Sequence, residues 1–255
     1  MSLTFTDCTY RYKRRNRPVL ADFSYELREG LTVLLGPNGA GKSTLLRLGA
    51  SVIRPQSGRI SWDAIASTTR EYRRHVSWMP QQITAMAGLT AREQVAYTGW
   101  LKGMNRGDAW DRALEALTRV GLRDRAGDRV KTLSGGQLRR VGVAAALVHG
   151  SRVLLLDEPT AGMDPTQRRV FRDMLGTAVG AGGLSVLMST HDVADLAGEA
   201  DRVTVLSEGH IRFDGTPHHF LAQAPAGTPD SRHAEAAYTA LTLRGRADQQ
   251  DAWVH

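Results

Sequence analysis

The sequence contains a single cysteine, Cys8, among 255 residues. One cysteine cannot form a disulfide within the chain, so a disulfide-stabilised fold is excluded and a reducing compartment is favoured. No apolar run reaches the roughly 18 residues that a membrane-spanning helix requires. The run VGVAAALV at 141–148 suits a short buried helix instead. The N-terminus also lacks the basic-then-apolar pattern of a signal peptide, so we expect a protein that stays in the cytoplasm.

Lysine is scarce as well, and Lys13, Lys42, Lys102 and Lys131 are the only lysines among 33 basic residues. With 26 acidic residues the net charge is +7, a value compatible with binding nucleic acid or an anionic membrane surface. The arginines, however, are scattered along the chain, and only RYKRRNR at 11–17 is a dense block. Charge alone therefore gives little support for nucleic-acid binding, and we expect no nucleic-acid partner.

Segments rich in strand-forming residues alternate with segments of helical periodicity. The run LTVLL at 31–35 is almost continuously apolar, which is typical of a strand buried in a sheet, and RVLLLDEP at 152–159 returns to this buried-strand pattern. Further strands are expected at 3–12, 18–27, 58–62, 75–80, 183–190 and 201–206, the first two as edge strands. Helices are expected at 43–52 and from Pro165, the latter capped by Asp164. Strands alternating with helices indicate a largely parallel sheet.

A helical block interrupts this alternation between about residues 84 and 148. Thr90 and Glu93 form a capping box at the start of one helix. The remainder of the block also has helical apolar spacing. After residue 230 the sequence AEAAYTALTL predicts a short helix, and the polar end that follows it is expected to be disordered.

The segment GPNGAGKST at 36–44 matches the phosphate-binding pattern G-x-x-x-x-G-K-[ST] between an expected strand and an expected helix. Glycines let backbone N–H groups curve around phosphate oxygens, and the helix N-terminus adds partial positive charge. Lys42 can reach the β- and γ-phosphates, and the Ser43 hydroxyl can ligate Mg²⁺. The expected nucleotide-binding residues are Gly36, Pro37, Asn38, Gly39, Ala40, Gly41, Lys42, Ser43 and Thr44. An incidental glycine-rich turn is the alternative, and this context disfavours it.

Two adjacent carboxylates follow the apolar run VLLL at 153–156. Asp157 therefore lies at the C-terminal end of a buried strand, where open α/β sheets bind ligands. We expect Asp157 to hold Mg²⁺ through water, and Glu158 to orient and partly deprotonate an attacking water. A solvated charge at a strand end is the alternative interpretation of Glu158.

A second anion-binding turn is expected at LSGGQ, residues 133–137. Ser134 and Gln137 form an S-x-x-Q capping box at the start of a basic helix. Gly135 and Gly136 leave backbone N–H groups uncovered beside the helix dipole, which suits a γ-phosphate. On local grounds a plain helix cap is the alternative.

With these motifs in this order, the chain resembles the ATP-binding subunit of an ABC transporter over about residues 3–225. LSGGQ matches the family's signature sequence without substitution. The resemblance implies an α/β P-loop NTPase fold with a mostly parallel sheet, an antiparallel β edge region and an inserted helical subdomain. It implies an ATPase domain over 1–229, with the helical insert at about 84–148, and a tail over 230–255. ATP and Mg²⁺ are the implied ligands.

Other residues receive roles only through this resemblance. Gln81 falls where the family has a glutamine that touches Mg²⁺ and faces the membrane partner, with Gln82 as an adjacent rival. Asp164 resembles the D-loop aspartate, and His191 resembles the switch histidine that contacts the γ-phosphate. With His191 added through the resemblance, the expected catalytic set consists of Glu158, His191 and Lys42.

Tyr12 is similar in position to the aromatic residue that stacks on adenine in the family. Tyr10 is a second candidate, and packing in an edge strand is the alternative role. The chain departs from the family pattern at Ser51 and Ala64, where glycine is usual, and at Met163, where leucine is common. None of these departures touches a chemical role.

The resemblance also implies two ATPase subunits packed head to tail. LSGGQ of one subunit closes over ATP held by the P-loop of the other, and a two-fold pair makes two such sites. The second subunit is expected to be another copy of this chain. ATP binding then favours the closed pair, provided that ATP has different affinities for the two states. The implied partner is a separate membrane permease, which locates the ATPase on the inner face of the cell membrane.

The direction of transport is the least specific expectation. The compact segment after Gln81 and the tail resemble ATPases that export drugs, antibiotics, peptides or lipids more than importers with added C-terminal domains. An importer ATPase is the alternative within the family. A soluble ABC ATPase acting on ribosomes or nucleic acid usually carries two cassettes or long inserts, and a P-loop kinase is disfavoured by LSGGQ and by a carboxylate placed for water.

Overall fold

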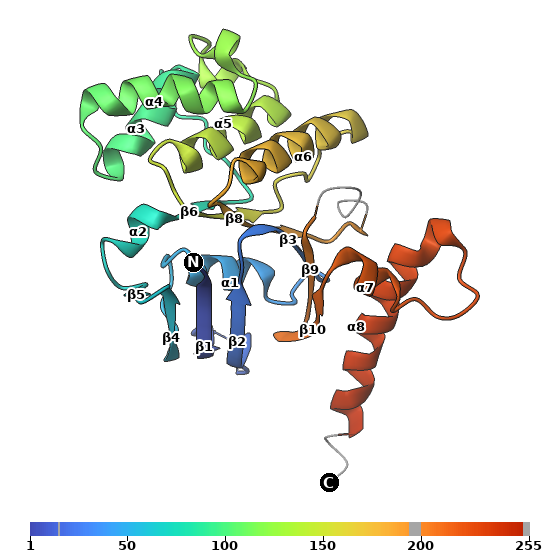
Figure 1. Cartoon of the computed structure of the whole chain (residues 1–255). Coiled ribbons are helices and arrows are strands. Elements are labelled where there is room, and N and C mark those ends of the chain that lie inside the picture. Colours follow the sequence, from blue (N-terminus) through green and yellow to red (C-terminus); the bar gives the residue numbers. More distant parts are fainter. Residues whose placement is uncertain (15, 194–199, 252–255) are drawn as a thin grey trace.

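A six-stranded sheet forms the centre of the computed structural model, which describes residues 1–14, 16–193 and 200–251 (Figure 1). Its strands are β3 (Gly30–Leu35), β6 (Val76–Met79), β7 (Val153–Asp157), β8 (Ser185–Thr190), β9 (Arg202–Ser207) and β10 (His210–Gly215). They lie in the order β10-β9-β3-β8-β7-β6, and every neighbouring pair is parallel except β10 with β9. The predicted parallel sheet is therefore confirmed, whereas β10 was not predicted.

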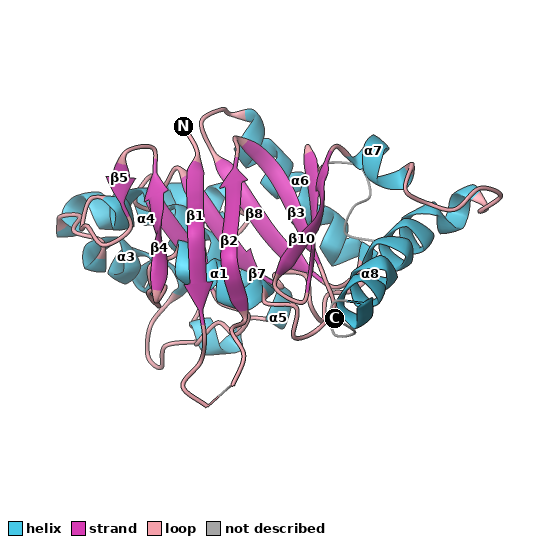
Figure 2. Cartoon of the chain, turned by 90° about the horizontal axis from the view of Figure 1, so that it is seen from below, coloured by secondary structure: helices cyan, strands magenta, loops and turns pink. Residues whose placement is uncertain are grey.

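A second, antiparallel sheet lies beside the first (Figure 2). It consists of β1 (Leu3–Tyr10), β2 (Leu20–Leu27), β4 (Ser57–Trp62) and β5 (Ile65–Ala66), in the order β2-β1-β4-β5. The prediction of an edge strand at 3–12 is wrong, because β1 pairs with both β2 and β4. Alternation in a sequence reveals which face of a strand is buried, but it does not reveal how many neighbours pair with its backbone.

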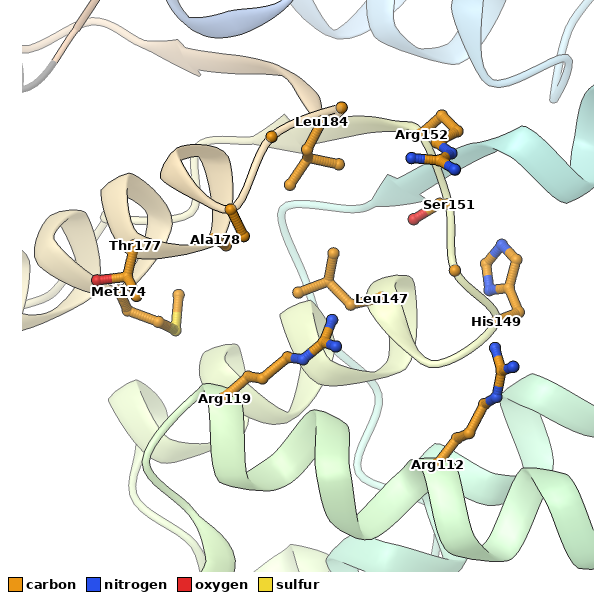
Figure 3. A pocket seen from close by; sticks show the side chains of 14 residues that line it. Arg112, Arg119, Leu147, His149, Ser151, Arg152, Met174, Thr177, Ala178 and Leu184 are labelled. Carbon is orange, nitrogen blue, oxygen red and sulfur yellow. The ribbon is translucent and has the colours of Figure 1, made fainter.

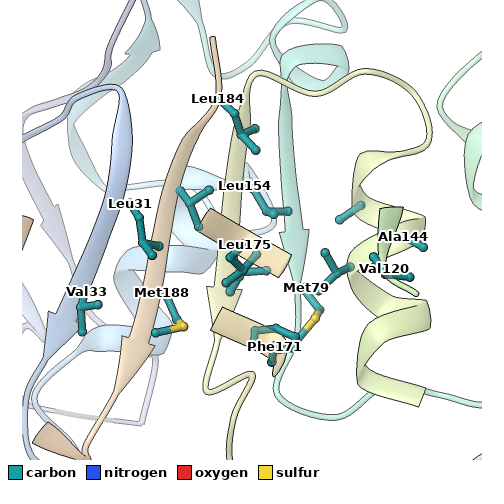
Figure 4. Packing of buried hydrophobic residues seen from close by; sticks show 14 of the residues in the cluster. Leu31, Val33, Met79, Val120, Ala144, Leu154, Phe171, Leu175, Leu184 and Met188 are labelled. Atoms are coloured by element: carbon teal, nitrogen blue, oxygen red, sulfur yellow. The ribbon is translucent and has the colours of Figure 1, made fainter. Parts of the chain in front are cut away.

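The parallel sheet separates two hydrophobic cores, because successive side chains of a strand point to opposite faces. Leu31, Val33 and Leu35 of β3 pack on the side of the helical block, together with Met188 of β8 (Figure 4). Leu34 points the other way and packs among side chains of the antiparallel sheet and three leucines of helix α1 (Lys42–Gly49). The loop between β3 and α1 is therefore anchored at both ends by buried elements.

The helices α3 (Ala91–Leu101), α4 (Arg106–Arg119) and α5 (Gly135–Leu147) form the predicted helical block (Figure 1). Its predicted capping boxes are present at Thr90 and Ser134. Asp164 caps α6 (Pro165–Gly180), because its carboxylate accepts from the N–H of Gln167 at 2.8 Å. A single helical turn, α2 (Tyr72–His75), precedes β6. Within the described ranges no helix is both long and apolar enough to cross a membrane.

The C-terminal region contains the helices α7 (Pro217–Leu221) and α8 (His233–Asp251). Ala237 and Leu241 of α8 are buried in the core on the helical-block side of the sheet. The expectation of a disordered polar end is wrong as far as Asp251, because α8 continues through the polar segment. Good helix formers such as Arg and Gln extend a helix that tertiary packing has already nucleated. Residues 252–255 lie outside the described part of the chain.

His149, at the end of the helical block, is predicted to make stability depend on pH. Burial, and to a lesser extent Coulombic repulsion from Lys102 and His75, lowers the pKa of its imidazole to about 4. In the unfolded chain this imidazole takes up a proton near pH 6.5, whereas in the folded chain it stays neutral until the pH approaches 4. The free energy of unfolding is therefore highest above pH 6.5 and decreases as the pH falls toward 4. Urea titrations at pH 7 and at pH 5 measure this effect. Between the two pH values, the free energy of unfolding of the native chain should decrease by about 1 to 2 kcal/mol more than that of His149→Gln. An equal loss in both proteins would contradict this role, since the carboxylates titrate in both.

Candidate active site

The loop at 36–44 has a backbone conformation that its glycines make possible. Gly39 and Gly41 have φ values of 84° and 109°, in the left-handed region that favours glycine. A Cβ on Gly36 would stand 2.3 Å from the carbonyl oxygen of Leu206, so this position also excludes a side chain. Gly41 is the N-cap of α1, and the first N–H groups of a helix have no intrahelical acceptor. The loop is thus an anion-binding turn at a helix N-terminus.

Lys42 places its ammonium inside this loop. The side chain is buried and donates to the carbonyl oxygens of Gly36 and Pro37. Burial lowers the pKa of the Lys42 ammonium, and the carboxylates of Glu158 and Asp157 raise it in part. A buried cation whose hydrogen-bond acceptors are neutral carbonyls can exchange them for phosphate oxygens, which bind it more strongly.

Asp157 lies at the carboxyl end of β7, beside the start of α1. Its Oδ1 accepts from the Ser43 hydroxyl at 2.9 Å and from the Ser189 hydroxyl at 3.0 Å. A hydroxyl and a carboxylate are oxygen ligands of the kind Mg²⁺ prefers, and Mg²⁺ is commonly held by one or two such groups together with substrate phosphates. Ser43 and Asp157 therefore fit a Mg²⁺ ion at the end of the phosphate-binding loop.

Glu158 is held at both carboxylate oxygens. Gln81 donates from Nε2 to Oε2 at 2.9 Å, and His191 Nδ1 lies 3.2 Å from Oε1. The residue has a φ of 46°, which is strained for a side chain other than glycine. Its N–H donates to the Ser189 hydroxyl at 3.0 Å, and its carbonyl accepts from Arg139 at 3.1 Å. These contacts fix the orientation of a carboxylate next to Asp157.

Two residues that the sequence did not single out complete this arrangement. The Ser189 hydroxyl links Asp157 to the backbone of Glu158, and Arg139 bonds to the carbonyls of both Glu158 and Gln81. Burial lowers the pKa of the Arg139 guanidinium, and Glu158 raises it in part. Arg139 belongs to the basic run that follows LSGGQ, and its spacing gives no sign of this contact. A serine two residues before His191, at the end of a buried strand, was the only available signal for Ser189.

Ser189→Ala is expected to reduce both stability and turnover. The substitution removes the buried hydrogen bond from the Ser189 hydroxyl to Asp157 and leaves the partly buried N–H of Glu158 without its acceptor, which costs about 1–3 kcal/mol. Turnover should fall several-fold because Asp157 and Glu158 lose the hydroxyl that orients them. Urea unfolding and steady-state ATPase assays measure the two effects. Ser185→Ala is the matched control at the other end of β8, since the Ser185 hydroxyl takes no part in this network; similar turnover losses in both variants would contradict the orienting role.

The signature segment is not brought to the phosphate-binding loop. Ser134 and Gln137 bond to each other as a capping box, with Gln137 N donating to Ser134 Oγ at 3.3 Å. Together with Met163 and Gln167 they line a separate cavity of about 240 Å³. In the described parts of the chain no hydrogen bond joins residues 134–137 to residues 36–44. A ligand of the phosphate-binding loop would need a second molecule to meet this turn.

The two tyrosine candidates, the two glutamine candidates and Asp164 differ in whether they contact the phosphate-binding loop or Glu158. The Tyr12 hydroxyl is 3.2 Å from the Thr44 hydroxyl, and its ring packs edge-on against Tyr10 with centroids 5.0 Å apart. Tyr12 therefore lies next to the phosphate-binding loop, while Tyr10, two residues earlier, is the last residue of β1. Gln81 reaches Glu158, whereas the exposed Gln82 does not. The Asp164 carboxylate caps α6.

The ABC transporter family model matches residues 20–161 of this chain. Among curated relatives, the chain is 38% identical to ATP-binding cassette sub-family A member 17 of Rattus norvegicus, over 81% of this chain and 12% of the relative. It is 37% identical to the daunorubicin/doxorubicin resistance ATP-binding protein DrrA of Streptomyces peucetius, over 72% and 56%. It is 33% identical to the phosphonates import ATP-binding protein PhnC of Bordetella parapertussis, over 84% and 91%. The chain thus spans only part of the first two relatives.

Solved structures give the same assignment. The dimeric bacterial ABC transporter cassette MJ0796 superposes with a TM-score of 0.74 at 27% identity, over 84% of this chain and 98% of that one. A dimeric post-hydrolysis state of MJ0796 bound to ADP and Pi matches equally well. The chain belongs to the ABC transporter family and carries its ABC ATPase domain. The predicted P-loop NTPase fold and ATPase class are confirmed.

Proposed function

We propose that this chain is the ATP-hydrolysing subunit of an ABC exporter. The observation that carries this proposal is Glu158, whose carboxylate is oriented by Gln81 and His191 directly beside the Asp157–Ser43 pair. A carboxylate fixed next to the end of a phosphate-binding loop is suited to activating water against a terminal phosphate. The proposed ATPase domain covers residues 1–229, with 230–255 as a tail.

Each site residue has a distinct proposed role. The loop at 36–44 cradles the phosphates, with Lys42 on the β- and γ-phosphates and Tyr12 beside the adenine. Ser43, Asp157 and Gln81 would hold Mg²⁺, which neutralises the phosphate charge when bound. Glu158 accepts a proton from the attacking water, and His191 contacts the γ-phosphate.

The functional unit that we propose is a head-to-tail pair of ATPase subunits. Two features support it: the separation of LSGGQ from the phosphate-binding loop within one chain, and the dimeric state of the MJ0796 cassette. In the pair, Ser134, Gly135, Gly136 and Gln137 of one subunit contact ATP on the other, with Asp164 at the junction. Closure of the pair on ATP would drive a separate membrane permease, which places this chain at the inner face of the membrane.

Export is the direction we favour, because DrrA is named for drug resistance and aligns over 72% of this chain. Import is the specific second candidate, because this chain covers 91% of the phosphonate import protein PhnC. Transport of radiolabelled solute in inside-out membrane vesicles separates the two. Exporters accumulate solute in such vesicles in an ATP-dependent manner, and importers release preloaded solute.

The transporter assignment is tested by purifying the tagged chain from detergent-solubilised membranes of its native host. A multi-spanning membrane protein should co-purify in equal proportion and should alter the ATPase rate when the two are reconstituted together in liposomes. Recovery of the chain with ribosomes or nucleic acid, without any membrane protein, would overturn the transporter proposal while leaving the ATPase class intact.

A further inference from the structure

A cavity of about 670 Å³ lies at the end of the sheet where β7 and β8 begin (Figure 3). Its walls come from α4, from the end of α5 with the following turn, and from the end of α6. None of the residues assigned to the ATP site lines it. Cavities of this size accommodate small organic ligands.

Three arginines dominate the polar part of this cavity. Arg112 and Arg119 come from α4, and Arg152 precedes β7 (Figure 3). Over the described ranges no acidic side chain lines the cavity, and none of the three guanidinium groups forms an ion pair. Glu115 lines only a smaller adjoining cavity, and Glu29 is engaged with the N–H of Gly183 at 2.6 Å. Among the described residues, therefore, none of the three arginines has a carboxylate within ion-pair distance, and Glu115 lines the adjoining cavity together with Arg112 and Arg119.

The glycine turn at Gly183 makes room for the guanidinium group of Arg152, whereas Gly150 lies at an ordinary van der Waals distance from Arg112. Arg152 Nη1 lies 2.7 Å from the position that a Cβ would take on Gly183, and Arg112 Nη1 lies 3.7 Å from that position on Gly150. Both glycines have positive φ, at 73° and 76°, so side chains are disfavoured there. Helix ends near the cavity direct partial negative charge toward the arginines, but that effect is weaker than a full countercharge.

Another part of the cavity lining is apolar. It is formed by Leu147, Met174, Ala178 and Leu184, and Leu184 is buried (Figure 3). His149 adds no charge near neutral pH, because burial lowers the pKa of its imidazole to about 4. The cavity lining thus combines several guanidinium groups with aliphatic side chains.

We propose that this cavity binds an organic phosphate monoester. Guanidinium groups bind phosphate oxygens in bidentate fashion, and a dianion matches several arginines better than a single carboxylate does. The apolar wall accommodates the organic part of the same molecule. The walls of the cavity belong both to the helical block and to α6. A bound ligand therefore contacts the helical block and α6 at the same time. This proposal concerns a site separate from the ATP site and stands independently of the transport function.

The test uses phenyl phosphate as the probe, with the ATP site saturated by Mg²⁺ and a non-hydrolysable ATP analogue. In the full chain labelled at the methyl groups of its seven methionines, the Met174 signal should shift with the probe, and that of Met86 should not. The double variant Arg119→Gln/Arg152→Gln should weaken binding about tenfold or more in calorimetry. The control Arg54→Gln/Arg123→Gln removes the same charge from exposed positions outside the cavity and should bind as the native chain does.

Other probes define the ligand and its source. Phenol, which lacks the phosphate, should not shift Met174, and inorganic phosphate, which lacks the apolar part, should bind more weakly than phenyl phosphate. Flotation with phosphatidic acid vesicles, compared with phosphatidylcholine vesicles, would identify a lipid headgroup as the source, and phenyl phosphate binding alone would identify a soluble phosphate ester. Absence of a Met174 shift with phenyl phosphate, or equal affinity in the cavity variant and the control, would overturn the proposal.

Discussion

Glu158→Gln is expected to reduce ATP hydrolysis by about 10²- to 10⁴-fold while ATP binding persists. Glutamine keeps the size of the side chain and can remain between Gln81 and His191, but its amide cannot accept a proton from water. The phosphate-binding loop and the Ser43–Asp157 pair are left intact, so the nucleotide should still bind. Because the variant hydrolyses its bound ATP very slowly, the dimer should accumulate when ATP is added.

Three measurements examine this variant: steady-state phosphate release, nucleotide affinity, and size-exclusion chromatography with light scattering in Mg²⁺-ATP. Glu208→Gln provides a matched control, because Glu208 also follows a strand and has a positive φ of 52°, but it is exposed. The control separates loss of a strand-end charge from loss of the base. A wild-type hydrolysis rate in Glu158→Gln would refute its role as the general base.

Ser134→Arg is expected to lower turnover about 100-fold or more with nucleotide affinity nearly unchanged. The substitution puts a long cation where the partner's ATP would meet the N-terminus of α5, and it removes the Ser134 cap at a cost of about 1 kcal/mol. Asn105→Arg is the control for folding, because Asn105 caps α4 in the same manner, accepting from Asp108 N at 2.8 Å. That control should retain turnover.

Mixing two inactive variants tests the shared site directly. Ser134→Arg retains a working phosphate-binding loop, and Lys42→Ala retains a working signature turn. In a head-to-tail pair of the two chains, one of the two sites is assembled entirely from native residues, so the mixture should regain part of the activity. Continued inactivity of mixed pairs whose formation has been verified, for example by differential tagging, would contradict a site shared between subunits.

The local chemistry of the ATP site could be predicted from sequence because it is carried by short contiguous motifs. The glycine spacing of 36–44 dictates a turn with positive φ, and the apolar run before Asp157 dictates a buried strand that ends in a carboxylate. The capping boxes at Thr90 and Ser134 were predictable for the same reason, since both partners lie within one helical turn.

Other features depend on contacts between distant segments and were missed. β10 is partly exposed, and its sequence lacks a clear alternation of apolar and polar residues, so it was not predicted as a strand. It pairs with β9 because the tight turn between them brings the two segments together. Arg139 reaches the carbonyl of Glu158 only because α5 packs next to the end of β7. The central position of β1 required the partners β2 and β4, which come later in the chain.

The sequence by itself determined the class of chemistry: a phosphate cradle, a pair of carboxylates and a signature turn, each set by residues adjacent in the chain. Only the tertiary structure decided how Glu158 is held, because Gln81 comes from one segment and Ser189 and His191 from another, and both segments meet Glu158 at one end of the parallel strands. It also decided that LSGGQ lies apart from the phosphate-binding loop and that three arginines line one cavity together with aliphatic side chains. Spacing along a chain specifies turns and helix caps, whereas packing specifies which turns share a site.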